Sequence, residues 1–96
     1  MVNTNVKSPI ARQLLSAQVV HEAQKVLNSL LPHAGEMIKV VSYKNDTLSI
    51  NCKNSAYAQE VYHKRLQLHD AVTMAVPNVN ISKIQTRLVA DFEIDV

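Results

Sequence analysis

Apolar and polar residues alternate in the middle of the chain, and this pattern predicts a central strand. The apolar positions are Leu48, Ile50 and Cys52, and the residues between them are polar. A period of two is typical of a strand with one buried face. Asn54 and Ser55 then end the strand, and either side chain can cap a helix by accepting a backbone hydrogen bond. The pattern therefore predicts a strand that leads directly into a helix.

A second pattern, with apolar residues three or four positions apart, predicts a long first helix. Ser8 is a suitable cap, and Pro9 fits the first helical position, where its missing N–H is not needed. Pro32 ends the helix, because it disfavours helical geometry in the residue before it. The expected buried stripe consists of Ile10, Leu14, Ala17, Val20, Ala23, Leu27 and Leu30.

The remaining elements follow in order along the chain. Residues 37–43 predict a strand, and residues 45–46 predict a hairpin turn to the central strand. A second helix is expected over 55–75, with a possible break near 67–70, and a last strand over 82–90. If the last two strands are neighbours, the helix between them makes the pairing parallel and the crossover right-handed.

The hairpin allows two registers. A two-residue turn would pair Tyr43 with Leu48, whereas a longer turn with a bulge would place Ile38 and Val40 on the core face. We favour the second register slightly. Either way, one core is expected beneath the first helix, formed by Leu48, Ile50, Val61, Leu68, Val72, Ile84 and Leu88, with Tyr57 largely buried beside it.

These elements predict an α+β fold with the order α-β-β-α-β, in which helices cover one face of a small three-stranded mixed sheet. The expected domain spans residues 9–90, preceded by a flexible arm (1–8) and followed by an acidic tail (91–96). The 96 residues suffice for one core, and 47% hydrophobic against 19% charged residues argues against disorder. We expect a cytoplasmic protein for three reasons. The single cysteine lies on the buried face of a predicted strand, no leader sequence is recognised, and no apolar run is long enough to span a membrane.

Catalytic and metal-binding patterns are missing from the sequence. One glycine cannot build a phosphate-binding loop, and the four histidines lack metal-ligand spacing. We therefore expect no enzyme activity, no catalytic residue, no metal, no cofactor and no small-molecule substrate.

Basic residues are the one candidate functional feature. Residues 1–90 contain ten Lys and Arg against five Asp and Glu. The candidates for binding nucleic-acid phosphates are Lys44, Lys53, Lys64, Arg65, Lys83 and Arg87. Basic residues that point outward from a strand also keep a sheet edge soluble. The alternative interpretation is therefore that these residues only face solvent and bind no nucleic acid.

The stretch from the central strand into the second helix resembles the DciA family of bacterial proteins, which load or operate the replicative DNA helicase and carry a KH-like domain. The matching residues, in order, are Leu48, Ile50, Ser55, Tyr57, Ala58, Gln59, Glu60 and Val61. Tyr57 stands where relatives usually have Trp, and the basic segment common in relatives is missing. The RNA-clamping Gly-x-x-Gly loop of KH domains is also absent.

This resemblance implies a KH-like fold and a non-catalytic adaptor that helps load the replicative helicase and binds DNA weakly. The expected partner surface is the polar face of the second helix: Glu60, His63, Lys64 and Gln67, with Glu60 and Lys64 as an ion pair. The alternatives are a small RNA- or ribosome-associated KH-like protein, and a protein-interaction module that binds no nucleic acid.

Overall fold

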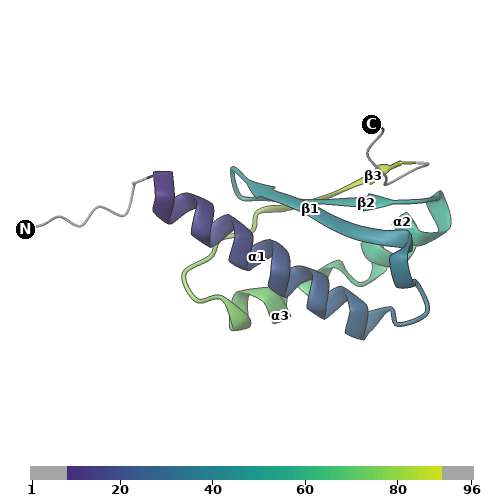
Figure 1. Ribbon diagram of the computed structural model, residues 1–96. Helices are drawn as coiled ribbons and strands as arrows, with labels where there is room; N and C mark the ends of the chain where they lie inside the picture. Colours follow the sequence, from purple (N-terminus) through teal and green to yellow (C-terminus); the bar gives the residue numbers. More distant parts are fainter. Residues whose placement is uncertain (1–8, 90–96) are drawn as a thin grey trace, which may run out of the picture.

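A computed structural model describes residues 9–89, so the predicted arm and acidic tail lie outside the described residues. The helices are α1 (Pro9–Leu30), the short 3₁₀ helix η1 (Gly35–Met37), α2 (Ser55–His63) and α3 (Arg65–Ala75). The strands are β1 (Ile38–Lys44), β2 (Thr47–Cys52) and β3 (Lys83–Leu88) (Figure 1).

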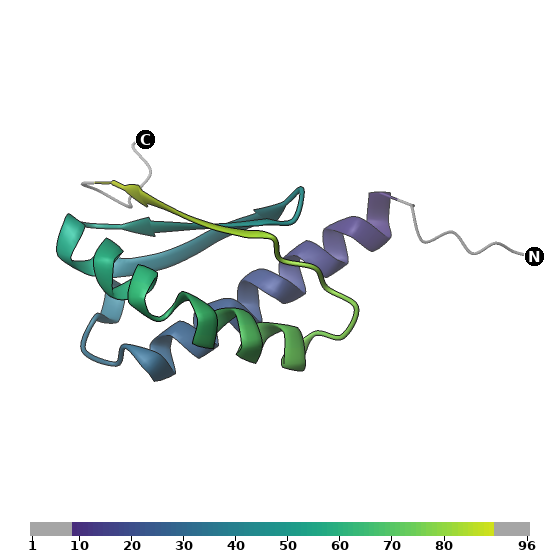
Figure 2. The same cartoon turned by 180° about the vertical axis from the view of Figure 1, so that it is seen from behind.

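The three strands form one mixed sheet in the order β1-β2-β3. The hairpin pair β1–β2 is antiparallel, and β2–β3 is parallel across the helical crossover. The long helices lie on one side of the sheet, with α1 beneath β1 and α2 and α3 beneath the other strands (Figures 1 and 2). The predicted α+β class, element order and strand directions are therefore confirmed.

The hairpin combines features of both predicted registers. Asn45 and Asp46 form a two-residue turn with positive φ angles of 52° and 60°, the geometry of the turns that match strand twist. This turn pairs Tyr43 with Leu48, but a bulge between Val40 and Ser42 then shifts the register. Because of the bulge, the side chains of Val40 and Ile38 lie on the buried face of the sheet. The prediction that Ile38 and Val40 face the core is thus correct. The prediction of a turn longer than two residues is wrong.

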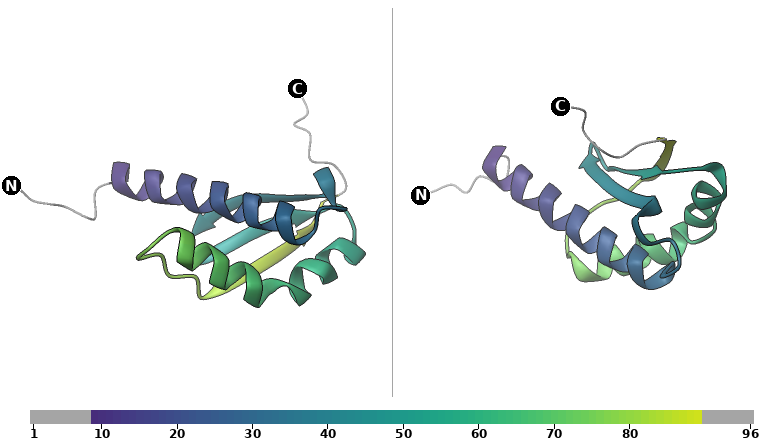
Figure 3. Two further views of the ribbon diagram at one scale, coloured as in Figure 1. Left: turned by 90° about the horizontal axis from the view of Figure 1, so that it is seen from below. Right: turned by 45° about the vertical axis from the view of Figure 1, so that its right-hand side comes forward.

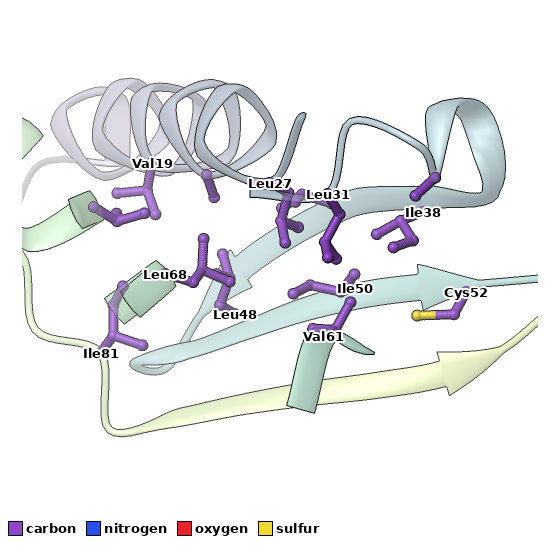
Figure 4. Close-up of a cluster of buried hydrophobic side chains, with 14 of the residues drawn as sticks. Val19, Leu27, Leu31, Ile38, Leu48, Ile50, Cys52, Val61, Leu68 and Ile81 are labelled. Carbon is purple, nitrogen blue, oxygen red and sulfur yellow. The ribbon is translucent and has the colours of Figure 1, made fainter. Parts of the chain in front are cut away.

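The core lies between the sheet and the helices (Figure 4). Five of its predicted members have no exposed surface: Leu48, Ile50, Val61, Leu68 and Val72. Ile84 is partly buried against them. Leu88 is 62% exposed, so its placement in the core was wrong. It lies at the last position of an edge strand, where fewer neighbours surround a side chain. Tyr57 is only half-buried rather than largely buried.

The buried stripe of α1 differs from the predicted one. Val19, Ala23 and Leu27 face the core, whereas Leu14 is 67% exposed and Ala17 is also exposed. Adjacent apolar pairs occur along this helix at 14–15, 19–20 and 26–27, and Leu30 at its end is followed by Leu31. Two overlapping stripes are therefore equally apolar in the sequence, and packing on the sheet selects one of them.

The predicted second helix is divided into two. Lys64 separates α2 from α3 with φ −98° and ψ 8°, three residues before the expected break. Neither proline nor glycine occurs at this position, so the sequence gives no breaker signal. At the start of α2, Asn54 is the cap, and its side-chain oxygen accepts a hydrogen bond from the Tyr57 N–H at 3.1 Å.

The hairpin turn is joined to the entry of β3 by hydrogen bonds around Asp46. Its carboxylate accepts from the Asn80 amide at 3.1 Å, and its carbonyl accepts from the Ser82 N–H at 2.9 Å. The Tyr43 hydroxyl donates to the Asn80 carbonyl at 2.5 Å, and the Asp46 carboxylate lies 3.3 Å from the same hydroxyl oxygen. Burial and the nearby Asp46 charge raise the pKa of Tyr43.

The buried thiol of Cys52 gives a testable pH dependence. Burial raises its pKa above the ordinary value of 9.0. Above pH 9 the unfolded chain therefore loses this proton before the folded chain does, so stability falls as the pH rises. We expect urea unfolding between pH 8 and 10 to show this fall, and Cys52→Ala to reduce its slope. An unchanged slope in the variant would contradict the assignment.

Candidate nucleic-acid interface

The three strands carry basic residues but no acidic ones. Their four cations are Lys39, Lys44, Lys83 and Arg87, and all four side chains are exposed. Asp46 is the nearest acidic residue in sequence, and it lies in the hairpin turn rather than in a strand. The strands therefore contribute charge of one sign only.

Strand pairing places all four cations on the face of the sheet away from the helices. Leu48, Ile50 and Cys52 are buried toward the helical layer, so the alternate residues of β2 point to the opposite face. Residues directly opposite one another in neighbouring strands share a face. The partners of those alternate β2 residues include every strand cation. We call this surface the open face, since no described helix covers it (Figure 3).

The open face has three rows that cross the sheet. The outer rows are Lys39–Asn51–Arg87 and Lys44–Thr47–Lys83. Between them runs the neutral row Ser42–Ser49–Gln85. At about 3.3 Å per strand residue, the outer rows lie about 13 Å apart along β2. Each outer row thus has a cation at either end and a short polar side chain in the middle.

The structure brings together three of the six predicted phosphate-binding residues on the open face: Lys44, Lys83 and Arg87. Lys53 is exposed directly after β2, at the end of the sheet where Arg87 lies. Lys39 was missed. A two-residue turn without a bulge would set it opposite Cys52, whereas the bulge sets it opposite Asn51 on the open face. The favoured register could have found it, because Ile38 and Val40 on the core face leave Lys39 on the other face.

The other two predicted residues, Lys64 and Arg65, lie in the helical layer and not on the open face. Both are half-buried at the junction of α2 and α3. The Arg65 guanidinium lies 3.8 Å from the centre of the Tyr62 ring and donates to the Tyr62 carbonyl at 2.7 Å. These contacts direct Arg65 toward the end of the preceding helix, α2, so the six residues do not form one continuous surface.

The expected partner surface on the second helix is also divided. The break at Lys64 separates Glu60 and His63 on α2 from Gln67 on α3, so they do not share one regular helix face. Glu60 is paired with His33, with 2.7 Å between Oε1 and Nε2. Among the described residues no ion pair joins Glu60 to Lys64, so the predicted pair was wrong. His33, in the segment between α1 and η1, contacts the Glu60 carboxylate in place of Lys64.

Other kinds of site were sought in residues 9–89. No cluster of His, Cys, Asp and Glu in this part of the chain could hold a metal ion. No described helix is long and apolar enough to cross a membrane. Cys52 is buried, as predicted. The open face is therefore the strongest candidate site in the described structure.

The comparisons with known proteins add no family assignment. No protein-family model matches the chain, and no curated protein matches its sequence. The likeness to the DciA family thus stays a resemblance carried by the residues from Leu48 to Val61.

Proposed function

We propose that this protein is a non-catalytic adaptor of the DciA type, with a KH-like domain, that binds DNA weakly through the open face and helps load the replicative helicase. The observation that carries the DNA-binding part is the placement of four cations, and no acidic residue of the described strands, on a sheet face that no described helix covers. Phosphate neutralisation by Lys and Arg gives sequence-tolerant, salt-sensitive binding. Phosphate contacts position a protein without reading sequence, so no base preference is expected.

The helicase role is supported by the resemblance over strand β2 and the start of α2. The helices lie on one side of the sheet (Figure 1), and the strand register places the cations on the other side. A protein partner bound to α2 near Glu60 and His63 would therefore leave the open face accessible to DNA. Simultaneous contact with two partners is what an adaptor requires.

A salt titration tests DNA binding. Three to four phosphate contacts predict a slope of about −3 in log affinity against log salt on duplex DNA. Fluorescence anisotropy with a labelled oligonucleotide, from 0.05 M salt upward, measures it. Replacing Lys39, Lys44, Lys83 and Arg87 together by Gln should abolish binding.

Lys25→Gln is the matched control, because Lys25 is an exposed cation on α1 in the helical layer. It removes one charge without touching the open face, so binding should persist. If neither single-stranded nor duplex DNA binds at low salt, the proposed function is wrong. Equal losses in the control and in a single open-face variant would point to net charge rather than to this face.

A further inference from the structure

We infer that the open face binds the two backbones of a B-form DNA duplex on either side of the major groove, in preference to single-stranded DNA. This inference rests on the proposed function and specifies its ligand. It follows from the spacing of the two outer rows, from the neutral row between them and from the side chains that the open face lacks.

The first argument is spacing. The outer rows lie about 13 Å apart by strand geometry. The major groove of B-form DNA is about 12 Å wide, so one row can approach each of its two backbones. Each row ends in a cation on β1 and a cation on β3, so each backbone would meet two charges. The long Lys and Arg side chains accommodate small differences in width.

The second argument concerns the neutral row. Ser42, Ser49 and Gln85 lie between the cations and carry no charge. Ser49 is only 8% exposed, so the centre of the face holds little accessible polar surface. A single strand crossing the middle of the face would place its phosphates over uncharged residues. A groove placed there would put the phosphates over the two outer rows instead.

The third argument is the absence of a stacking surface. Single-strand binding domains commonly stack bases on exposed aromatic side chains. The three strands contain one aromatic residue, Tyr43, which pairs with Leu48 on the helical side of the sheet. Its hydroxyl group is bonded to Asn80. In the described strands the open face has no aromatic side chain on which an unpaired base could stack, so paired DNA is the better ligand.

Competition and footprinting test this inference. A 20-base-pair duplex of mixed sequence, each of its strands alone and a duplex RNA of the same sequence serve as the probes, all at 0.05 M salt. We expect the DNA duplex to bind at least tenfold more tightly than either strand and more tightly than the RNA. Hydroxyl-radical footprints should show protection on both strands, on the two sides of one major groove.

Single substitutions add a quantitative check. Each of Lys44→Gln and Arg87→Gln removes one cation from a different row. Loss of one phosphate contact, with a slope of about 0.9, predicts about 15-fold weaker duplex binding at 0.05 M salt. In contrast, Gln85→Lys adds a charge in the neutral row, away from either backbone. It should change duplex affinity less than threefold.

The outcomes separate this inference from the proposed function. Equal or tighter binding of a single strand, or protection of one strand only, overturns the groove arrangement while DNA binding stands. Tenfold tighter DNA binding by the Gln85→Lys variant would also overturn the groove arrangement. It would mean that phosphates lie over the neutral row at the centre of the open face. Tighter binding of the RNA duplex would overturn the choice of DNA. Absence of binding to every probe overturns both proposals.

Discussion

Leu68→Ala is expected to lower the free energy of unfolding by about 3 kcal/mol, within the usual range of 2–5 kcal/mol for a buried leucine. Leu68 has no exposed surface and points from α3 toward Leu48 on the sheet (Figure 4). Truncation removes these contacts and leaves a cavity that rigid strands cannot fill. A domain of this size typically has only 5–15 kcal/mol of stability, so the melting temperature should fall markedly.

Leu66 provides a matched control two residues away on the same helix. It is 68% exposed, so Leu66→Ala makes the same chemical change outside the core. Its effect should lie within about 0.5 kcal/mol. Urea unfolding of both variants, followed by circular dichroism, compares them directly. Similar destabilisation by the two substitutions would mean that the orientation of α3 described here is wrong.

Gln24→Leu is expected to destabilise the protein by about 1–3 kcal/mol and to promote self-association. Gln24 projects from α1 onto the outer edge of β1. Its Oε1 accepts from the Val40 N–H at 2.8 Å, and its Nε2 lies 3.4 Å from the Ile38 carbonyl. The amide thus occupies backbone groups that a neighbouring strand would otherwise use. Leucine leaves the nearly buried Val40 N–H without this partner and exposes a strand edge.

Gln18→Leu is the control for this effect. Gln18 is exposed on the same helix, and no hydrogen bond joins it to the described part of β1. It adds the same apolar surface without uncovering the edge. Sedimentation velocity over a range of concentrations measures association, and urea unfolding measures stability. If Gln24→Leu matched Gln18→Leu in both measurements, the edge-covering role of Gln24 would be disproved.

The sequence was most informative where one face of an element is buried and local signals agree. Leu48 and Ile50 alternate with polar residues and precede a capping side chain, so the central strand and the following helix were predictable. The directions of the strands followed from the connections between them. These features depend on short stretches of chain, which sequence patterns describe directly.

The buried face of α1 and the register of the hairpin could not be predicted, because both depend on packing between segments that are distant in the sequence. Both Val19 and Val20 are apolar, and only the sheet determines which of them faces inward. The bulge after Val40 reconciles two registers that exclude each other in a regular hairpin. That single extra residue also places Lys39 on the open face, so a small local irregularity adds one cation to the site.

The parallel pairing of β3 with β2 has a consequence for how the protein folds. A two-residue turn joins β1 to β2, whereas residues 53–82 separate β2 from β3. Closing the longer segment costs more chain entropy, so β3 is expected to join an already formed hairpin. Lys83 and Arg87 arrive with that last strand. The paired cation rows therefore exist only in the fully folded chain, and a ligand that needs both rows stabilises the complete fold alone.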